Sequence, residues 1–145
     1  MRVFFYIYSI ILDTNVLLDT IVERDNPQFT DDASTILSLG ETQVIELFMS
    51  ALSIPVIAYV IKNVNATRKK AIIKDLISIV KVLPSLPQHV DNILESAMND
   101  IEDALQVQSA KEGQCDIIVT RDIADFKESD IPVISPQDLL SRIIE

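Results

Sequence analysis

The chain has 145 residues, 48% of them hydrophobic and only two of them glycine, which suits one domain over residues 1–145 with a sizeable core. This composition excludes a disordered protein and a glycine-rich phosphate loop, and the single cysteine precludes an internal disulfide and fits a reducing cytoplasm. The formal net charge of −10 argues at first against a nucleic-acid ligand, because phosphate backbones bind through Lys and Arg.

The apolar stretch at residues 3–12 is too short to span a membrane, which takes roughly 20 residues. It also lacks a small-residue cleavage site, so we expect neither a signal peptide nor a membrane anchor. Residues 1–8 are expected either to extend the first strand or to add an edge to it.

The first strand is the apolar run Ile10-Ile11-Leu12, which ends at Asp13. Such a run indicates a strand buried on both faces, as in a parallel sheet covered by helices. A carboxylate is compatible with this run only where the strand emerges from the core. Ligands of open α/β sheets bind at the carboxyl ends of the strands, so Asp13 is a candidate site residue.

The middle of the chain alternates between helix and strand patterns, with no visible linker or repeat. Loops are predicted at 24–27 and after Gly40, which is expected to end a helix. The predicted helices are residues 16–23, 31–39, 53–61, 65–77 with Asn65 as its cap, and 88–98, and the predicted strands are residues 44–49 and 80–83.

The last third of the chain carries the other candidate acids. A helix opens near Asp100 and Asp103 and is stopped by Gly113, and a strand at 116–120 is followed by Asp122. A final strand at 133–134 precedes a helix whose start is marked by the residues at 135–138. The alternation predicts an α/β fold, a three-layer α/β/α sandwich with a mostly parallel central sheet.

Three acids are expected to meet at one edge of this sheet. A helix that precedes a parallel strand runs opposite to it, so Asp103 in the first turn lies beside the strand end that carries Asp122. Asp13 follows a strand of the same sheet. Three carboxylates at one edge form a set of hard oxygen ligands suited to Mg²⁺ or Mn²⁺.

The sequence resembles the PIN-domain nucleases in three ordered motifs, 12–15 (Leu-Asp-Thr-Asn), 103–105 (Asp-Ala-Leu) and 119–122 (Val-Thr-Arg-Asp). The longer stretches 100–106 and 115–126 resemble the VapC-like toxin branch of bacterial PIN-domain ribonucleases. The resemblance implies a cytoplasmic metal-dependent endoribonuclease with an RNA substrate and a cognate antitoxin, and it implies a homodimer. It also implies that Asp13, Asp103 and Asp122 are catalytic metal ligands, that Asp100 is a further metal-binding residue, and that Asn15 and Thr120 orient them.

Several of these polar residues have structural alternatives. Asp100 can be only the cap of its helix, and Asp103 only a favourable first-turn acid. Asp116 begins its strand at the opposite edge, so a structural role is expected. His89 is expected at the surface near a helix start, and Cys115 as an inert core thiol.

One departure from the family pattern concerns a glutamate expected early in the helix after the second strand. Residues 50–57 contain no acid there, and Val56 or Pro55 stands in its place. Glu46 is near in sequence but falls within the predicted strand. Three carboxylates suffice for one Mg²⁺, which keeps several waters, whereas a second metal would be held poorly. The alternative is a PIN scaffold that binds RNA or a partner protein and cuts weakly or not at all.

The basic residues are unevenly distributed. Five of the twelve fall within the thirteen residues 62–74, which contain no acid. This segment is either an RNA-phosphate clamp, centred on Arg68, Lys69 and Lys70, or a solvated helix face. Arg121 is a further candidate for phosphate contact, or it points to solvent.

Overall fold

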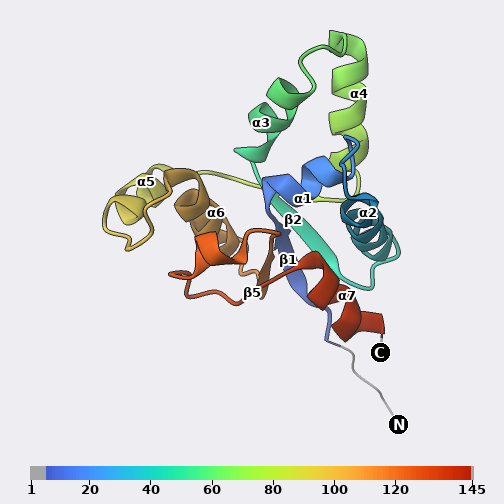
Figure 1. Ribbon diagram of the computed structural model, residues 1–145. Helices are drawn as coiled ribbons and strands as arrows, with labels where there is room; N and C mark the ends of the chain where they lie inside the picture. Colours follow the sequence, from blue (N-terminus) through green and yellow to red (C-terminus); the bar gives the residue numbers. More distant parts are fainter. Residues whose placement is uncertain (1–5, 145) are drawn as a thin grey trace.

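The computed structural model describes residues 6–144, and residues 1–5 and Glu145 lie outside the description that follows. Its centre is a five-stranded, all-parallel sheet in the order β3-β2-β1-β4-β5 (Figure 1). The strands are β1 (Ser9–Leu12), β2 (Glu46–Ser50), β3 (Lys81–Leu83), β4 (Ile117–Val119) and β5 (Val133–Ile134).

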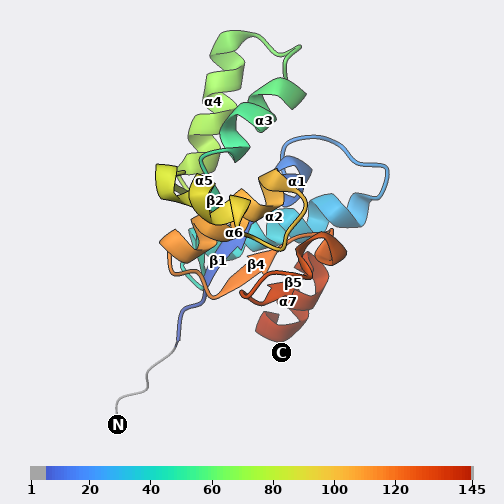
Figure 2. The same cartoon turned by 90° about the vertical axis from the view of Figure 1, so that its left-hand side faces the viewer.

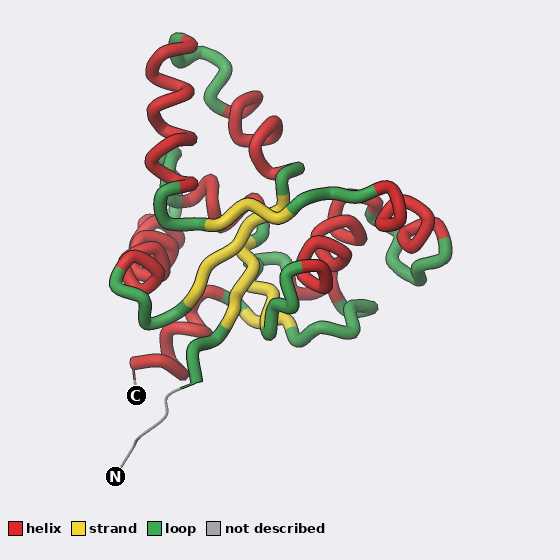
Figure 3. The backbone as a smooth tube through the Cα atoms, turned by 180° about the vertical axis from the view of Figure 1, so that it is seen from behind, coloured by secondary structure: helices red, strands yellow, loops and turns green. Residues whose placement is uncertain are grey.

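Helices cover both faces of the sheet, as the three-layer prediction requires (Figures 1 and 3). On one side α2 packs against α7, and on the other α5 packs against α6. A hairpin of α3 and α4 projects past the end of the sheet (Figure 2). The helices are α1 (Thr14–Asp19), α2 (Pro27–Glu41), α3 (Ser53–Val60), α4 (Ala66–Ile77), α5 (Pro87–Leu94), α6 (Ile101–Glu112), α7 (Pro136–Ile144) and the short 3₁₀ helix η1 (Ile123–Phe126).

Strand β1 is buried on both faces, as its apolar run predicts. Ile10 and Leu12 belong to the core cluster that contains α2 and α7 residues, whereas Ile11 packs in a second cluster with α6 residues. All three side chains are 0% exposed. Full burial on both sides of a parallel strand places its polar residues at its ends, which is where Asp13 lies.

The start of α2 corrects the predicted boundaries. The helix begins at Pro27, within the predicted loop, because Asn26 caps it by accepting a hydrogen bond from the Gln28 backbone N–H at 3.0 Å. Gly40 lies inside α2 and does not end it. A Cβ at Gly40 would stand 2.4 Å from Leu47 Cδ1, so the glycine permits close packing against β2.

The surface position predicted for His89 is wrong. Its side chain is 3% exposed, and its Nδ1 accepts a hydrogen bond from the Leu86 backbone N–H at 3.0 Å. That leaves Nε2 to carry the proton toward Glu112 Oε2, 3.3 Å away on α6. His89 therefore caps α5 and joins it to α6. Helix α5 ends at Leu94, four residues before its predicted end.

The amino-terminal edge of the sheet carries the structural residues expected there. Asp116 accepts hydrogen bonds from the Tyr6 hydroxyl at 2.6 Å and the Ser9 backbone N–H at 2.9 Å, in agreement with a structural role. Residues 6–8 are not in a strand, and the predicted extension over 1–5 lies outside the described residues. Cys115 is buried, and burial raises the pKa of its thiol to about 12, as an inert core thiol requires.

Within residues 6–144, the helices are too short or too polar for a membrane span.

Candidate active site

Asp13 lies at the carboxyl end of β1 and is also the N-cap of α1, which begins at Thr14, two residues earlier than predicted. Its backbone N–H donates to Val119 O of β4 at 2.9 Å, and its side chain accepts from the Thr14 N–H at 2.8 Å. The side chain of Thr120 donates to the other carboxylate oxygen at 2.7 Å. Asp13 is 7% exposed and held at the sheet edge by donors from both neighbouring segments.

Asp122 is joined to the same edge through two of the predicted orienting residues. The Asn15 side-chain amide donates to Asp122 Oδ2 at 2.8 Å. The Asp122 backbone N–H donates to the Thr120 hydroxyl at 3.0 Å, and that hydroxyl donates in turn to Asp13. Asn15 and Thr120 thus connect the first and third predicted motifs, as expected of orienting groups.

Asp103 lies in the first turn of α6, and Asp100 is the N-cap that accepts its backbone N–H at 2.9 Å. Burial raises the pKa of Asp103 to about 7, with further contributions from the negative charges of Asp100, Asp13 and Asp125. The capping role of Asp100 is therefore confirmed, and its role toward a metal stays a prediction.

Asp13 has a raised pKa as well. Burial is the main cause, and the charges of Asp122 and Glu102 add to it, against the hydrogen bonds from Thr120 and Thr14. The acids of β1, α6 and the β4–η1 turn therefore influence one another electrostatically. Glu102 and Asp125 also contribute to this field, although the sequence reasoning did not single them out; both lie inside the motif stretches.

The carboxylates are not assembled into a cage in the described side-chain positions. Among residues 6–144, no group of three His, Cys, Asp or Glu side chains is arranged to hold an ion. The residues nevertheless fit a divalent cation, because hard oxygen donors lie there with pKa values raised by burial and like charge. The side-chain oxygen Oδ1 of Asn15, beside Asp122, is buried and has no hydrogen-bond partner within the described part of the chain, which leaves a further oxygen donor at this edge.

Arg121 has a different environment from the one predicted. Its guanidinium binds Asp19 of α1, with Nε 2.7 Å from Oδ2 and a second nitrogen 3.3 Å from Oδ1. It also stacks on the ring of Phe29, with Cζ 4.2 Å from the ring centroid. Arg24 binds the same carboxylate at 2.7 Å. Arg121 is therefore partnered within the fold next to Asp122, which gives it a structural role, and its contact with phosphate stays a prediction.

The basic segment covers the turn before α4 and most of α4, in the hairpin that projects past the sheet (Figure 2). Asn65 caps this helix, as predicted, by accepting from the Arg68 backbone N–H at 2.8 Å. Arg68 and Lys70 are exposed and Lys69 is half-buried. None of the three has an ion-pair partner among the described residues, so their side chains are available for an anionic ligand.

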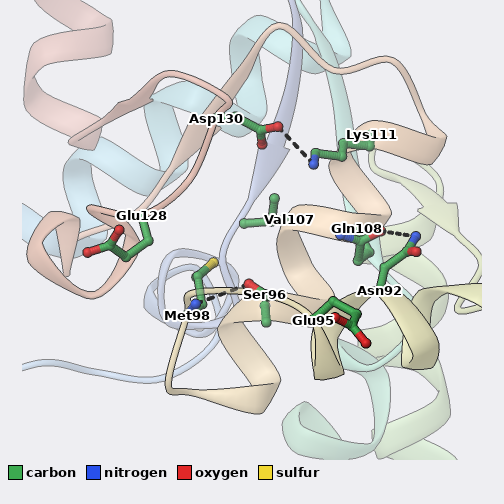
Figure 4. Close-up of a pocket in the computed structure, with 10 residues that line it drawn as sticks. Asn92, Glu95, Ser96, Met98, Val107, Gln108, Lys111, Glu128 and Asp130 are labelled. Carbon is green, nitrogen blue, oxygen red and sulfur yellow. Dashed lines mark hydrogen bonds and ion pairs between the residues drawn. The ribbon is translucent and has the colours of Figure 1, made fainter.

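A cavity of about 500 Å³ lies elsewhere, between α5, α6 and the loop around Asp130 (Figure 4). Two interactions lie at its rim: an ion pair between Lys111 and Asp130 at 2.9 Å, and a hydrogen bond from the Asn92 amide to Gln108 Oε1 at 2.9 Å. The three candidate aspartates do not line it. The candidate active site thus lies apart from this cavity, at the carboxyl edge of the sheet.

The fold is an all-parallel α/β/α domain with acidic side chains at the carboxyl edge, the place where such sheets bind their ligands. The sequence profile of the PIN domain matches residues 9–124, and the chain belongs to the PIN-domain family.

Known proteins similar to the chain share its length. It is 26% identical over 140 residues to ribonuclease VapC1 of Aquifex aeolicus (strain VF5), which covers 92% of this chain and 94% of the relative. A DNA-bound VapBC structure from Salmonella typhimurium has a TM-score of 0.64 at 16% identity, covering 90% of this chain and 99% of that one. PAE2754 from Pyrobaculum aerophilum has a TM-score of 0.63 at 17% identity, covering 94% and 90%. These structural neighbours confirm the predicted fold.

Proposed function

We propose that this protein is a metal-dependent endoribonuclease, with Asp13, Asp103 and Asp122 holding Mg²⁺ or Mn²⁺ at the carboxyl edge of the sheet. The observation that carries the proposal is the hydrogen-bond link from Asp13 through Thr120 to Asp122, at the edge where burial and the charges of Asp100, Asp13 and Asp125 raise the pKa of Asp103 to about 7. Acids placed close enough to repel one another are stabilised by a cation bound between them. Similarity to ribonuclease VapC1 supports RNA as the substrate.

The chain's own residues hold and orient the site in this proposal. The Thr120 hydroxyl fixes Asp13, and the Asn15 amide fixes Asp122. When bound, the ion activates water and neutralises charge that develops on the phosphate. Asp100 keeps α6 capped, so that Asp103 stays at the edge.

We further propose that the protein is the toxin of a toxin–antitoxin pair and acts as a homodimer in the cytoplasm. Support comes from the relatives, which include a ribonuclease VapC1 and a VapBC complex. The net charge of −10 is complementary to a basic antitoxin. The alternative, a scaffold that binds without cleavage, is favoured only by the absence of an acid at Val56.

Metal binding is tested by thermal melts across a Mn²⁺ titration. Wild-type protein should melt at higher temperature as Mn²⁺ rises, because a ligand that binds only the folded state stabilises it by mass action, about 2.7 kcal/mol at one hundred times Kd. Asp13→Asn should lose most of this response, and without metal it should be as stable as wild type or more so. An equal Mn²⁺ response in the two proteins would contradict the assignment.

The missing glutamate gives a second test. Val56 is half-buried and lies three residues after Ser53 on α3, so both side chains share one helix face, whereas Pro55 is exposed. Ser53 bonds the Thr14 hydroxyl beside Asp13 at 2.7 Å. Val56→Glu should therefore tighten Mn²⁺ binding and raise RNA hydrolysis severalfold, and Pro55→Glu should do less. If neither folded variant changes either quantity, no ligand is missing there.

The basic segment gives a third test. Replacing Arg68, Lys69 and Lys70 with Gln should weaken binding to every RNA sequence, because phosphate contacts carry no sequence information. The slope of log affinity against log salt should flatten by up to about 0.7 for each lost single-strand contact. Arg142→Gln on α7 is the control. An unchanged slope would identify the segment as a solvated helix face.

A further inference from the structure

Gln106 is a buried polar side chain at the centre of α6, and it ends the stretch 100–106 that resembles the VapC-like branch. It is 1% exposed, and its Nε2 lies 3.2 Å from Asp13 Oδ1 and 3.1 Å from Thr14 Oγ1. One amide nitrogen carries two hydrogens, so both are used. This contact fixes the orientation of the Gln106 amide, because the flipped amide would place its oxygen against the Asp13 carboxylate, and two acceptors repel.

The contact with Asp13 joins two of the three predicted motifs. The other donors to this carboxylate come from Thr14, next in sequence, and from Thr120 at the end of β4. Gln106 is the donor from α6, the helix that begins with Asp103. Gln106 follows Asp103 by three residues, so the two lie on neighbouring positions of one helix face. The amide therefore sets the position of Asp13 relative to the helix of Asp103.

The same network reaches the start of α3, where the family glutamate is missing. Thr14 Oγ1 lies 2.7 Å from Ser53 Oγ, and both residues are buried. Ser109, three residues after Gln106 on α6, donates from its hydroxyl to the hydroxyl of Ser50 on β2 at 3.1 Å. Hydrogen bonds between uncharged side chains thus connect α6, α1 and α3 next to Asp13.

We propose that Gln106 is a positioning residue of the metal site: by donating to Asp13 from α6, it holds the carboxylates of β1 and α6 in the relative placement that binding of the cation requires. This inference rests on the metal site of the proposed function. Gln106 itself does not contact the ion. Groups that orient metal-binding carboxylates change metal affinity by 10- to 100-fold when they are replaced.

The test is Gln106→Met, which keeps the length of the side chain and removes its hydrogen bonds, with Mn²⁺ alone as the probe in calorimetric titration of the full chain. We expect the Kd for Mn²⁺ to rise about tenfold or more. RNA hydrolysis should lose kcat with little change in KM for RNA, since RNA contacts are made elsewhere. Gln108→Met, two residues along the same helix and bonded to Asn92, is the matched control and should change neither quantity.

The outcomes separate this inference from the function on which it rests. A folded Gln106→Met that melts at lower temperature but binds Mn²⁺ as wild type does would make Gln106 only a structural residue and overturn the inference, while the metal site stands. Wild-type protein that binds no Mn²⁺ would overturn the proposed metal site and the inference together.

A second measurement uses the wild-type protein alone and so does not depend on whether a variant folds. In the wild-type protein, the side-chain amide resonance of Gln106 should shift when Mg²⁺ is added, because its acceptor Asp13 becomes a ligand, and that of Gln108 should not. A Gln106 amide that stays unchanged at saturating Mg²⁺ would contradict the proposal.

Discussion

Replacing Asp103 with asparagine is expected to reduce RNA hydrolysis by at least a hundredfold and, at pH 7, to make the metal-free protein more stable. The loss follows from removing one of three carboxylates that hold the ion. The gain follows from the pKa of Asp103, which burial and nearby acids raise from an ordinary 3.8 to about 7. A residue that serves only to stabilise the fold would change both quantities in the same direction.

The sign of the stability change is fixed by proton linkage. Between pH 4 and 7 the folded protein binds more protons at Asp103 than the unfolded chain does, so stability falls as pH rises. A pKa difference of about 3 corresponds to about 4 kcal/mol. Solvent screening at this half-buried side chain reduces the expected change in unfolding free energy to about 1–2 kcal/mol. In EDTA, Asp103→Asn and wild type should be equally stable near pH 4 and diverge toward pH 7, by urea unfolding.

The matched control is Asp138→Asn. Asp138 occupies the same third position of α7 that Asp103 occupies in α6, and it is exposed. It should alter hydrolysis little and change stability by less than 0.5 kcal/mol, in the range usual for surface substitutions. If Asp103→Asn behaves like this control, Asp103 is a first-turn helix acid and nothing more.

Replacing Asp19 with alanine is expected to cost about 3–5 kcal/mol of unfolding free energy, the largest effect of any single substitution considered for this chain. Its carboxylate is 0% exposed and is shared by Arg24 and Arg121 at 2.7 Å each. Removing it leaves two cationic groups, about a quarter exposed, without their partner. Arg121 precedes Asp122, so Mn²⁺ affinity should fall as well.

The exposed ion pair of Lys81 and Glu46 provides the comparison. Its atoms are 2.6 Å apart, as close as those of the buried cluster, but the two side chains are 67% and 40% exposed. Glu46→Gln should therefore cost at most about 1 kcal/mol. Urea unfolding of both variants tests whether burial of an ion pair or the distance between its atoms determines its contribution to stability. Similar losses in Asp19→Ala and Glu46→Gln would contradict the assignment of a buried, structurally required carboxylate.

The sheet was predictable because fully buried parallel strands have a distinctive apolar pattern. The runs that became β1 and β4 have little polar content, and each is followed by a candidate acid that the fold places at the carboxyl edge. The helix caps at Asn65 and Ser135 were equally predictable, and Ser135 accepts a hydrogen bond from the Asp138 backbone N–H at 3.0 Å. These signals are local in sequence, so no tertiary information was needed.

The errors arose where a tertiary contact decides the outcome. His89 is buried because Glu112, 23 residues away on another helix, provides a partner for its second nitrogen. Gly40 lies within α2, where a Cβ would stand 2.4 Å from Leu47 Cδ1 of β2, so this glycine permits close packing and does not mark the end of the helix. The Asn26–Pro27 start of α2 is the exception, since a cap residue followed by proline is a local signal for a helix start.

The sequence predicts Asn15 and Thr120 as orienting residues but not Gln106, for the same reason. Gln106 lies 93 residues from the carboxylate it contacts. Nothing in a helical Gln distinguishes a solvated side chain from a buried one without the packing of α6 on the sheet. Arg121 likewise shows its role only through Asp19 and Phe29, which approach it from α1 and α2.

The central claim is that this sheet edge hydrolyses RNA with a divalent cation. Its most direct test incubates purified wild-type protein with single-stranded RNA in Mn²⁺ and in EDTA, beside Asp13→Asn as the paired control. Wild type is expected to cleave the RNA internally in Mn²⁺ and not in EDTA, and Asp13→Asn is expected to cleave it under neither condition. RNA that is bound but left intact by wild type in saturating Mn²⁺, or cleaved equally by Asp13→Asn, would contradict it.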